Sequence, residues 1–386
     1  MKPRLRIAIL TRNFDPMGGG AERYAVALAE RLAVRHEVHV FAQHIAHQAP
    51  GLIYHRLPAL RKPRWINQLL FAYLAQRHTR VGFDIIHAHE NGWAGDVQTV
   101  HVRPMRHNLL GGLRGLRRGL RWLKIATSPR LATYLWLERS RFRPCPGRKV
   151  VAVSATLRYE VAMSYPESAT CLAVIPPGVS LPDKPPTQAE ARRALGLPKG
   201  IPLLLFVAND LARKGLDTAL QALRDSASVL SRCPQLAVVG GSPEQIHHYR
   251  RLATRLGLEG QVHFLGPQRA MSIVYAAADL LIHPTREDTF GMVVLEAMAH
   301  GLPVVVSRAP WCGMAADLSE KEAWLMDHPD DASSLAQAIQ RLLTDEAQWK
   351  QLARTGPLVA ARYAWDDIAK RHEALYRELL EARCAS

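Results

Sequence analysis

Short apolar runs alternate with longer segments of helical periodicity along the whole chain, and this alternation limits the possible folds more than any other feature. The runs have the composition of strands that are buried on both faces of a parallel sheet. The clearest of them are residues 5–10, 36–42, 83–90, 149–154, 202–210, 236–241, 262–266 and 280–283. Because the segments between them repeat apolar residues at helical spacing, we expect an α/β fold in which helices cover doubly wound parallel sheets.

A proline-rich stretch interrupts this alternation near the middle of the chain. The prolines recur from Pro176 to Pro202, and such a shift in composition indicates a domain boundary. A length of 386 residues suits two α/β domains. We therefore expect an N-terminal domain of residues 1–180 and a second domain of residues 181–365.

The stretch from His283 to Val306 joins a strand end, a polar loop and an apolar helix. The first N–H groups of a helix have no partner within the helix, and they lie at the positive end of its dipole. The helix start that follows the polar run 285–289 is thus a site for an anion such as phosphate. The residues expected at this start are Phe290, Gly291, Met292 and Val293.

Two acidic residues flank that helix start. Asp288 and Glu296 lie eight residues apart, and at ~1.5 Å rise per helical residue they are separated by roughly 10–12 Å, about the length of a nucleotide diphosphate sugar. Carboxylate oxygens accept hydrogen bonds from diols, so Asp288 suits the hydroxyls of a sugar and Glu296 those of a ribose. The simpler alternative is an ordinary crossover helix with solvated acids.

The phrase PTREDTFGMVVLEAMAHGLPV (284–304) resembles the acidic signature of retaining GT-B glycosyltransferases of family 4, also called glycosyl transferases group 1. In that signature an acid and a glutamate are separated by seven intervening residues. Asp288 holds the position where Glu is commoner, and Glu287 is an additional neighbour. Which of these two acids meets the sugar stays open, although the spacing favours Asp288.

The resemblance implies a GT-B architecture, in which two Rossmann-like domains face each other across a cleft. Residues 1–180 would form the acceptor-side domain and residues 181–365 the nucleotide-sugar domain. In this fold the last helix, here residues 366–386, crosses back to the N-terminal domain.

A glycine-rich loop follows the first strand. Gly18, Gly19 and Gly20 precede a helical segment and would let the backbone approach a phosphate. The phrase GGGAER resembles the first loop of the same family, where it faces the cleft. A dinucleotide-binding fingerprint is absent, because G-x-G-x-x-G is missing and the next strand ends in FAQH without a ribose-binding acid. This argues against a nucleotide-cofactor dehydrogenase.

Two histidines follow strand ends in the first domain. Ligands of parallel sheets collect beyond the carboxyl ends of the strands, so His89 and His101 are both candidates to lie near an acceptor hydroxyl. The phrase T-V-H resembles the cleft histidine of the family and favours His101. His89 reads more simply as a structural histidine.

The phrase NDLARKG follows the first strand of the second domain. Arg213 and Lys214 could hold a diphosphate and stabilise the charge that develops as it leaves. The family more often has an arginine where this chain has Asn209, and the N-D-x-x-R-K-G form resembles the lipopolysaccharide core glucosyltransferase branch. Gly241 could also approach the nucleotide, and the backbone near Leu265 resembles the segment that flanks the base.

Most of the excess of positive over negative charge comes from residues 103–149. The chain carries 50 basic and 34 acidic residues, for a net charge of +16, and this segment contains a single acid, Glu138. Leucines at Leu109, Leu113, Leu116, Leu120 and Leu123 follow a helical spacing among arginines, which predicts a basic amphipathic helix. Attachment to an anionic membrane, or packing on the domain with a solvated basic face, would each explain the pattern. Nucleic-acid binding is not favoured, because no aromatic and basic motif accompanies the charge.

The remaining features bear on location and cofactors. The five cysteines have no disulfide or metal spacing, which suggests reduced thiols in a cytosolic setting. We recognise neither a signal peptide nor an apolar run of the ~18 residues that span a membrane. There is no D-x-D motif, so we expect no metal requirement.

Together these observations predict a retaining hexosyltransferase that moves a sugar from a nucleotide sugar, most simply a UDP-sugar, to a hydroxyl of a lipid-linked glycan such as the lipopolysaccharide core. The enzyme would be peripheral on the cytoplasmic face of the inner membrane. Arg213 and Lys214 would hold the leaving diphosphate, Asp288 the sugar, and His101 the acceptor side. The alternative is a non-catalytic basic α/β protein that binds nucleic acid or anionic lipid.

Overall fold

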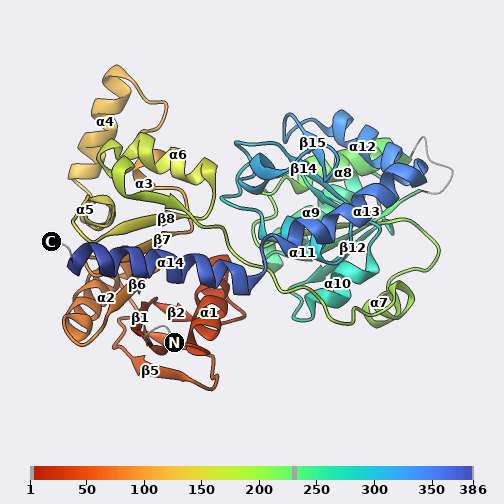
Figure 1. The fold of residues 1–386 in the computed structure, drawn as a ribbon. Helices are drawn as coiled ribbons and strands as arrows, with labels where there is room; N and C mark the ends of the chain where they lie inside the picture. Colours follow the sequence, from red (N-terminus) through yellow and green to blue (C-terminus); the bar gives the residue numbers. More distant parts are fainter. Residues whose placement is uncertain (1–3, 228–232, 385–386) are drawn as a thin grey trace. The chain divides into compact units, whose positions relative to one another are not determined.

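The computed structural model describes residues 4–227 and 233–384, which form two compact units (Figure 1). The first unit comprises residues 1–178 together with 365–386, and the second comprises residues 179–364. The divisions expected from the sequence fall after residues 180 and 365. Each unit is built around its own parallel sheet, which confirms the α/β, doubly wound fold class.

The sheet of the first unit has seven parallel strands in the order β5-β3-β1-β6-β7-β8-β9. Its central strand β1 buries four of its five residues, as expected for a strand covered on both faces. A separate two-stranded ladder pairs β2 (Asn13–Phe14) with β4 (His44–Ile45). The sheet strands are β1 (Arg6–Leu10), β3 (Glu37–Ala42), β5 (Leu52–Arg56), β6 (Ile85–Ala88), β7 (Val97–Val100), β8 (Lys149–Ala152) and β9 (Leu172–Val174).

Helices from both ends of the chain cover this sheet. The last helix, α14 (Trp365–Cys384), packs against α1 (Gly20–Ala33) within the first unit. It buries Ile368, Leu375 and Tyr376 along one face. The other helices of the unit are α2 (Arg64–Thr79), α3 (Met105–Leu110), α4 (Gly115–Ala126), α5 (Pro129–Phe142) and α6 (Ala155–Ser164), with a short 3-10 helix at Pro166–Cys171.

The basic segment differs from the single amphipathic helix expected over residues 109–124. Helix α3 ends at Leu110, and α4 begins only at Gly115. Gly112 and Gly115 have φ values of 69° and 52°, a left-handed conformation that a continuous right-handed helix cannot contain. The expected leucine stripe is therefore wrong as one surface, because Leu109 belongs to α3 and only three of the five leucines lie on α4.

The second unit contains a six-stranded parallel sheet in the order β12-β11-β10-β13-β14-β15. The strands are β10 (Leu203–Ala208), β11 (Gln235–Gly240), β12 (Val262–Gly266), β13 (Leu280–His283), β14 (Val304–Ser307) and β15 (Trp324–Met326). The helices are α7 (Gln188–Leu195), α8 (Leu216–Ala227), α9 (Pro243–Arg255), α10 (Met271–Ala277), α11 (Met292–Ala299), α12 (Ala332–Thr344) and α13 (Glu346–Ala361).

Two local expectations in this unit need adjustment. The proline-rich stretch is not all linker, because Thr187 caps α7 through a capping box that starts a helix between the prolines. The apolar residues of segment 216–230 recur at helical spacing, which predicts a helix there. Its described part forms α8, and residues 228–230 lie outside the part of the chain that the structure describes.

Strand order reverses beside the first strand of each sheet. The reversal lies between β1 and β6 in the first unit, and between β10 and β13 in the second. At such a switch point the loops after the two central strands diverge to opposite faces, which leaves space for a ligand beyond their carboxyl ends. The loops after these strands are therefore the places to look for function.

Candidate functional site

The loops that follow β10 and β13 meet at the switch point of the second unit. Lys214, after β10, places Nζ 2.7 Å from Oδ2 of Asp288, after β13. The same ammonium donates to the backbone carbonyl of Glu287 at 2.7 Å, and the Arg286 N–H donates to the Arg213 carbonyl at 3.0 Å. Lys214 and Asp288, which are 74 positions apart in the sequence, thus lie in one group, because the parallel strands β10 and β13 that precede them are neighbours in the sheet.

A glycine makes this close approach possible. Gly215 has φ of 82°, and a Cβ built on it would lie 2.1 Å from the backbone oxygen of Pro284. No other residue type has room there, so the chain after Lys214 can run against the loop after β13 only with glycine. The sequence phrase RKG is explained by this contact.

Asp288 is held from several directions. His283 Nε2 lies 3.0 Å from Asp288 Oδ2, and the Phe290 N–H donates to Oδ1 at 3.3 Å. Burial by itself would raise the pKa of Asp288, but the Lys214 ammonium and the His283 hydrogen bond more than offset it and hold the pKa well below its usual range. Asp288 is therefore a carboxylate at neutral pH.

His283 was not among the residues selected from the sequence. It ends β13 and is fully buried, and burial lowers its pKa. The signal available in the sequence was a polar residue at the end of an otherwise apolar strand, directly before the acidic phrase. We use the name switch-point cluster for Arg213, Lys214, His283, Glu287 and Asp288.

Arg213 and Glu287 form the more exposed part of the switch-point cluster. Arg213 Nη1 lies 3.9 Å from Glu287 Oε1, and Arg213 Nε lies 3.5 Å from Asp210 Oδ2. The Arg213 side chain is 52% exposed, compared with 15% for Lys214. Arg213 can therefore reorient toward a ligand, whereas Lys214 is already placed.

Helix α11 begins beside the switch-point cluster. Gly291 caps it with φ of 104°, and a Cβ there would lie 2.6 Å from Cys312 Sγ. By helix geometry the N–H groups of Met292 and Val293 have no intrahelical carbonyl to bind. Phe290, also predicted at this start, is buried, and its ring packs 5.9 Å from that of Tyr363. Its N–H donates to Asp288 and its carbonyl accepts the Met314 N–H, so its part is structural.

Glu296 lies one turn further along α11 and is held by a second helix. Its Oε2 accepts a hydrogen bond of 2.7 Å from the Tyr275 hydroxyl on α10. The residue is largely buried, and its backbone oxygen lies 2.8 Å from His300 Nδ1. The sequence predicted Glu296 but did not reveal the tyrosine that orients it.

The other two residues that were predicted to lie near the nucleotide, Gly241 and Leu265, are at the ends of neighbouring strands. Gly241 follows β11, and a Cβ on it would lie 2.7 Å from the Leu211 side chain in the loop after β10. Leu265 is in β12 at the edge of the sheet, and its carbonyl accepts from Gln268 at 2.8 Å. Both residues lie at the carboxyl ends of their strands, the same end of the sheet at which the switch-point cluster lies.

The carboxylate of Glu22, in the first turn of α1, lies beside the glycine loop of the first unit, and it was not among the residues selected from the sequence. Gly19 caps α1, and a Cβ built on it would lie 3.0 Å from Glu22 Oε2. Nothing lies within 4 Å of a Cβ on Gly20. A negative side chain therefore already sits at this helix start, where the sequence predicts a phosphate.

His101 and His89, the two candidate histidines, are in contact. His101 Nε2 lies 2.9 Å from His89 Nδ1, and their rings stack at 5.2 Å. His89 stacks in turn on His87 at 4.5 Å. Burial lowers the pKa of all three, that of His101 to about 3, so these histidines, which we call the histidine stack, are neutral.

The N- and C-terminal helices of the first unit enclose the histidine stack. His87 Nδ1 lies 2.7 Å from the hydroxyl of Tyr376, and His372 Nε2 lies 2.6 Å from that of Tyr24. Tyr376 and His372 are four residues apart on one face of α14. That spacing was visible in the sequence, but its partners were not.

Residues 4–227 and 233–384 contain no group of three or more His, Cys, Asp or Glu side chains that could hold a metal ion. Within the same ranges, no helix combines the length and apolar character needed to cross a membrane.

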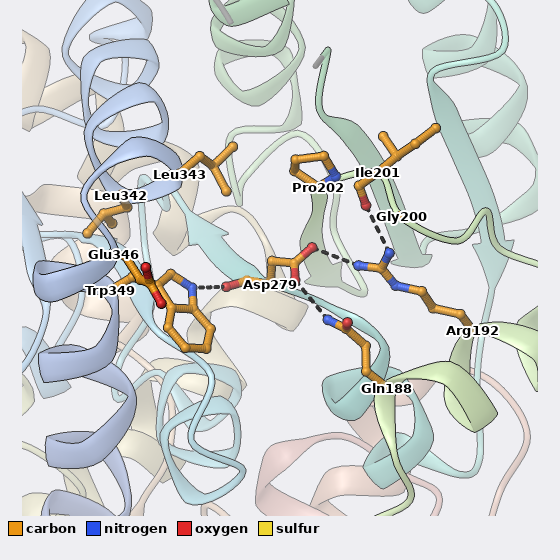
Figure 2. A pocket seen from close by; sticks show the side chains of 10 residues that line it. All are labelled: Gln188, Arg192, Gly200, Ile201, Pro202, Asp279, Leu342, Leu343, Glu346 and Trp349. Atoms are coloured by element: carbon orange, nitrogen blue, oxygen red, sulfur yellow. Dashed lines mark hydrogen bonds and ion pairs between the residues drawn. The ribbon is translucent and has the colours of Figure 1, made fainter. Parts of the chain in front are cut away.

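A cavity of about 350 Å³ lies at the opposite edge of the second sheet (Figure 2). Pro202 and Asp279, which line it, directly precede β10 and β13, whereas the switch-point cluster follows these strands. The Asp279 carboxylate is paired with Arg192 at 2.7 Å and with Gln188 at 2.8 Å. These contacts join α7 to the sheet, and the cavity is separate from the predicted donor residues.

Two family models match the chain. That of glycosyl transferases group 1 matches residues 187–358, and that of glycosyltransferase family 4 matches residues 18–182. The D-inositol 3-phosphate glycosyltransferase of Corynebacterium urealyticum is 33% identical over 234 residues, which are 57% of this chain and 54% of that protein. The lipopolysaccharide glucosyltransferase WaaG of Escherichia coli K12 is 28% identical over 231 residues, 57% of this chain and 60% of WaaG. The chain spans little more than half the length of the curated relatives it matches.

Solved structures share the fold over almost the entire chain. A crystal structure of WaaG has a TM-score of 0.80 at 23% identity and covers 95% of this chain and 98% of its own. Sucrose-phosphate synthase from Thermosynechococcus elongatus has a TM-score of 0.78 at 24% identity, with 98% and 100% covered. Anabaena HepE in complex with UDP-glucose has a TM-score of 0.73 at 20% identity, again with 98% and 100% covered.

The two family models match consecutive parts of the chain, one in each unit, and the fold agrees with them. The chain therefore belongs to the family 4 glycosyltransferases of the glycosyl transferases group 1 type, which have the GT-B fold.

Proposed function

We propose that this glycosyltransferase is a retaining hexosyltransferase that uses a nucleotide sugar, most simply a UDP-sugar, and needs no metal ion. The observation that carries the proposal is the pairing of Lys214 with Asp288 at 2.7 Å, beside the start of α11. It combines a fixed cation, a carboxylate and a helix N-terminus at a switch point. A leaving diphosphate needs positive charge, and a sugar needs hydrogen-bond acceptors.

Each residue then has a defined task. Lys214, Arg213 and the N–H groups at the start of α11 neutralise the diphosphate as the bond to the sugar breaks. Asp288 orients the sugar, while Glu287, which the Arg213 guanidinium approaches, is the second candidate for that contact. Glu296, oriented by Tyr275, accepts from the ribose. An oxygen of the leaving phosphate takes the proton of the acceptor hydroxyl, and His101 lies on the acceptor side.

The acceptor is proposed to be a lipid-linked glycan, in agreement with the similarity to the lipopolysaccharide glucosyltransferase WaaG. Helix α4 supports a membrane-bound acceptor, because it exposes Leu116, Leu120 and Leu123 and buries only Ile125. Its arginines and lysine are complementary to an anionic lipid surface. The enzyme would accordingly work at the cytoplasmic face of the inner membrane.

The donor site is tested with purified enzyme and a panel of UDP-, GDP- and ADP-sugars, by measuring donor hydrolysis and transfer. Lys214→Ala and Asp288→Ala should each lower kcat/KM at least a hundredfold, which corresponds to about 2.7 kcal/mol. Lys350→Ala is a matched control, since Lys350 forms an exposed ion pair on α13 in the same unit. Wild-type rates in both site variants would show that the assignment is wrong. Addition of EDTA should leave the rate unchanged.

The membrane interaction is tested by sedimentation with vesicles of neutral lipid alone and of neutral lipid with an anionic fraction. We expect binding only to the anionic vesicles, and loss of it when Leu116, Leu120 and Leu123 are replaced by Ser. Replacement of the exposed Leu358 on α13 by Ser is the control. Equal binding to neutral vesicles would eliminate the electrostatic part of the proposal.

A further inference from the structure

One oxygen of Asp288 accepts hydrogen bonds from two donors on different segments. Lys214 Nζ approaches Oδ2 at 2.7 Å from the loop after β10, and His283 Nε2 approaches it at 3.0 Å from the end of β13. The other oxygen, Oδ1, accepts the Phe290 N–H. The carboxylate is thus oriented by a buried histidine and a lysine at one oxygen and by a backbone N–H at the other.

The protonation state of His283 follows from its surroundings. The ring is 0% exposed, and Nδ1 has no hydrogen-bond partner. Two charged groups act on the ring: Asp288, which favours its protonation, and Lys214, which opposes it. Burial lowers the pKa of the ring although Asp288 opposes this, and the ring is neutral. Because Asp288 is an acceptor, the single ring proton must reside on Nε2.

This arrangement is an unfavourable way to fill a core position. A buried nitrogen without a partner loses its bond to water and gains nothing in return, whereas an apolar side chain of similar size would have no such cost. The benefit of histidine must therefore come from the bond that it makes through Nε2.

The backbone around Asp288 does not depend on that bond. The Asp288 N–H donates to the Trp311 carbonyl at 2.8 Å, and the Gly313 N–H donates to the Asp288 carbonyl at 2.9 Å. Loss of the histidine donor would consequently leave the Asp288 carboxylate bound only by the Lys214 ammonium and the Phe290 N–H, with the loop in place. A carboxylate with fewer hydrogen bonds would no longer hold the ammonium of Lys214 in one position.

Lys214 depends on this carboxylate for its direction. Of its three N–H groups, one binds Asp288 and one binds the Glu287 carbonyl within the described residues. The third is left for a phosphate oxygen, and its direction is set by the other two.

We propose that His283 is a positioning residue whose Nε2–H fixes the Asp288 carboxylate, and through it the ammonium of Lys214, for the diphosphate of the donor. The inference rests on the proposed function, because it assigns His283 to the same site. The chemical class recognised is a nucleoside diphosphate sugar.

The test compares His283→Leu, which has similar bulk and no donor, with His283→Gln, whose amide can donate at a similar reach. We expect His283→Leu to lower kcat about tenfold and to change KM for the donor less than threefold, since the nucleotide contacts are intact. His283→Gln should recover kcat to within threefold of wild type. The acidic limb of the pH profile of kcat should move to higher pH in His283→Leu, because loss of a hydrogen bond to the charged form raises the pKa of Asp288.

A measurement on the unmodified protein covers the case in which His283→Leu does not fold. Nitrogen-15 NMR of labelled histidine side chains should show His283 as the neutral Nε2–H tautomer from pH 6 to 9. The opposite tautomer, or equal kcat and an unshifted acidic limb in all three proteins, would overturn the inference. Lys214→Ala separates the two proposals. If it retains wild-type activity the proposed function fails, and if it is inactive while His283→Leu is not, only the role of His283 fails.

Discussion

Acidification should destabilise the first unit, because four neighbouring histidines are neutral in the folded state. They are His87, His89 and His372, which are buried, and the half-buried His101. Burial lowers the pKa of each, to about 3 for His101 and His372. In the unfolded chain the same side chains titrate near the ordinary value of 6.5.

The sign and size follow from proton linkage. Below pH 6.5 the unfolded chain binds more protons than the folded unit, so stability is present above this pH and is lost as the pH falls. At about pH 5.5 each histidine whose folded pKa is well below that pH costs about 1.4 kcal/mol relative to pH 8, and the four together cost about 5–6 kcal/mol. Domains of this size have stabilities of about 5–15 kcal/mol, so the loss is a large part of the whole.

Hydrogen exchange followed by mass spectrometry measures this effect in the strands themselves. After correction for intrinsic rates, the free energy of exchange for amides of β6 should fall by about 5–6 kcal/mol between pH 8 and about pH 5.5. His372→Gln, whose amide can still bind Tyr24, should reduce that fall by about 1.4 kcal/mol. The same change at His247, which is exposed on α9, should leave it unaltered. An equal free energy of exchange at both pH values would refute the reasoning.

Three further predictions concern single side chains. Gly291→Ala should destabilise the second unit by about 3 kcal/mol in urea unfolding, because the new Cβ would lie 2.6 Å from Cys312 Sγ at a φ of 104°. Tyr275→Phe removes a donor to Glu296 and should raise KM for the nucleotide sugar about fivefold with little change in kcat, as read from steady-state kinetics. Glu138→Ala should destabilise the first unit by about 3 kcal/mol in thermal unfolding, since this buried carboxylate accepts two backbone N–H groups at the start of α3 and a tyrosine hydroxyl.

Matched variants separate these effects from general damage. Gly257→Ala introduces a Cβ at a φ of 72° with no atom within 4 Å, so it measures the effect of backbone strain without a steric collision. It should lower the free energy of unfolding by less than Gly291→Ala does. Tyr159→Phe on the exposed face of α6 should change no kinetic constant. Equal costs for the two glycine variants would contradict the steric argument, and a lower kcat with unchanged KM in Tyr275→Phe would contradict the binding role of Glu296.

Local sequence determined the elements and the chemistry of the individual loops. Apolar runs such as β1 and β10 read as buried strands because each is covered on both faces, which leaves no alternation along the strand. The glycine and the acidic residues in the phrase from Pro284 to Val304 predicted a loop followed by a helix start. The glycines of the basic segment were visible as well, but the break between α3 and α4 depends on their left-handed backbone, which spacing alone does not reveal.

Tertiary structure decided which of these loops meet. Lys214 and Asp288 come together because β10 and β13 pair in the sheet, and strand pairing between distant segments leaves no mark in local periodicity. His283 was hidden for the same reason, since a buried histidine gains a role only from the carboxylate that the fold places beside it. The partners of the histidine stack come from α1, through the ring of Tyr24, and from α14, through the hydroxyl of Tyr376, at opposite ends of the chain. Sequence thus specified the residues and their local conformation, whereas the parallel sheets brought distant side chains within hydrogen-bonding distance.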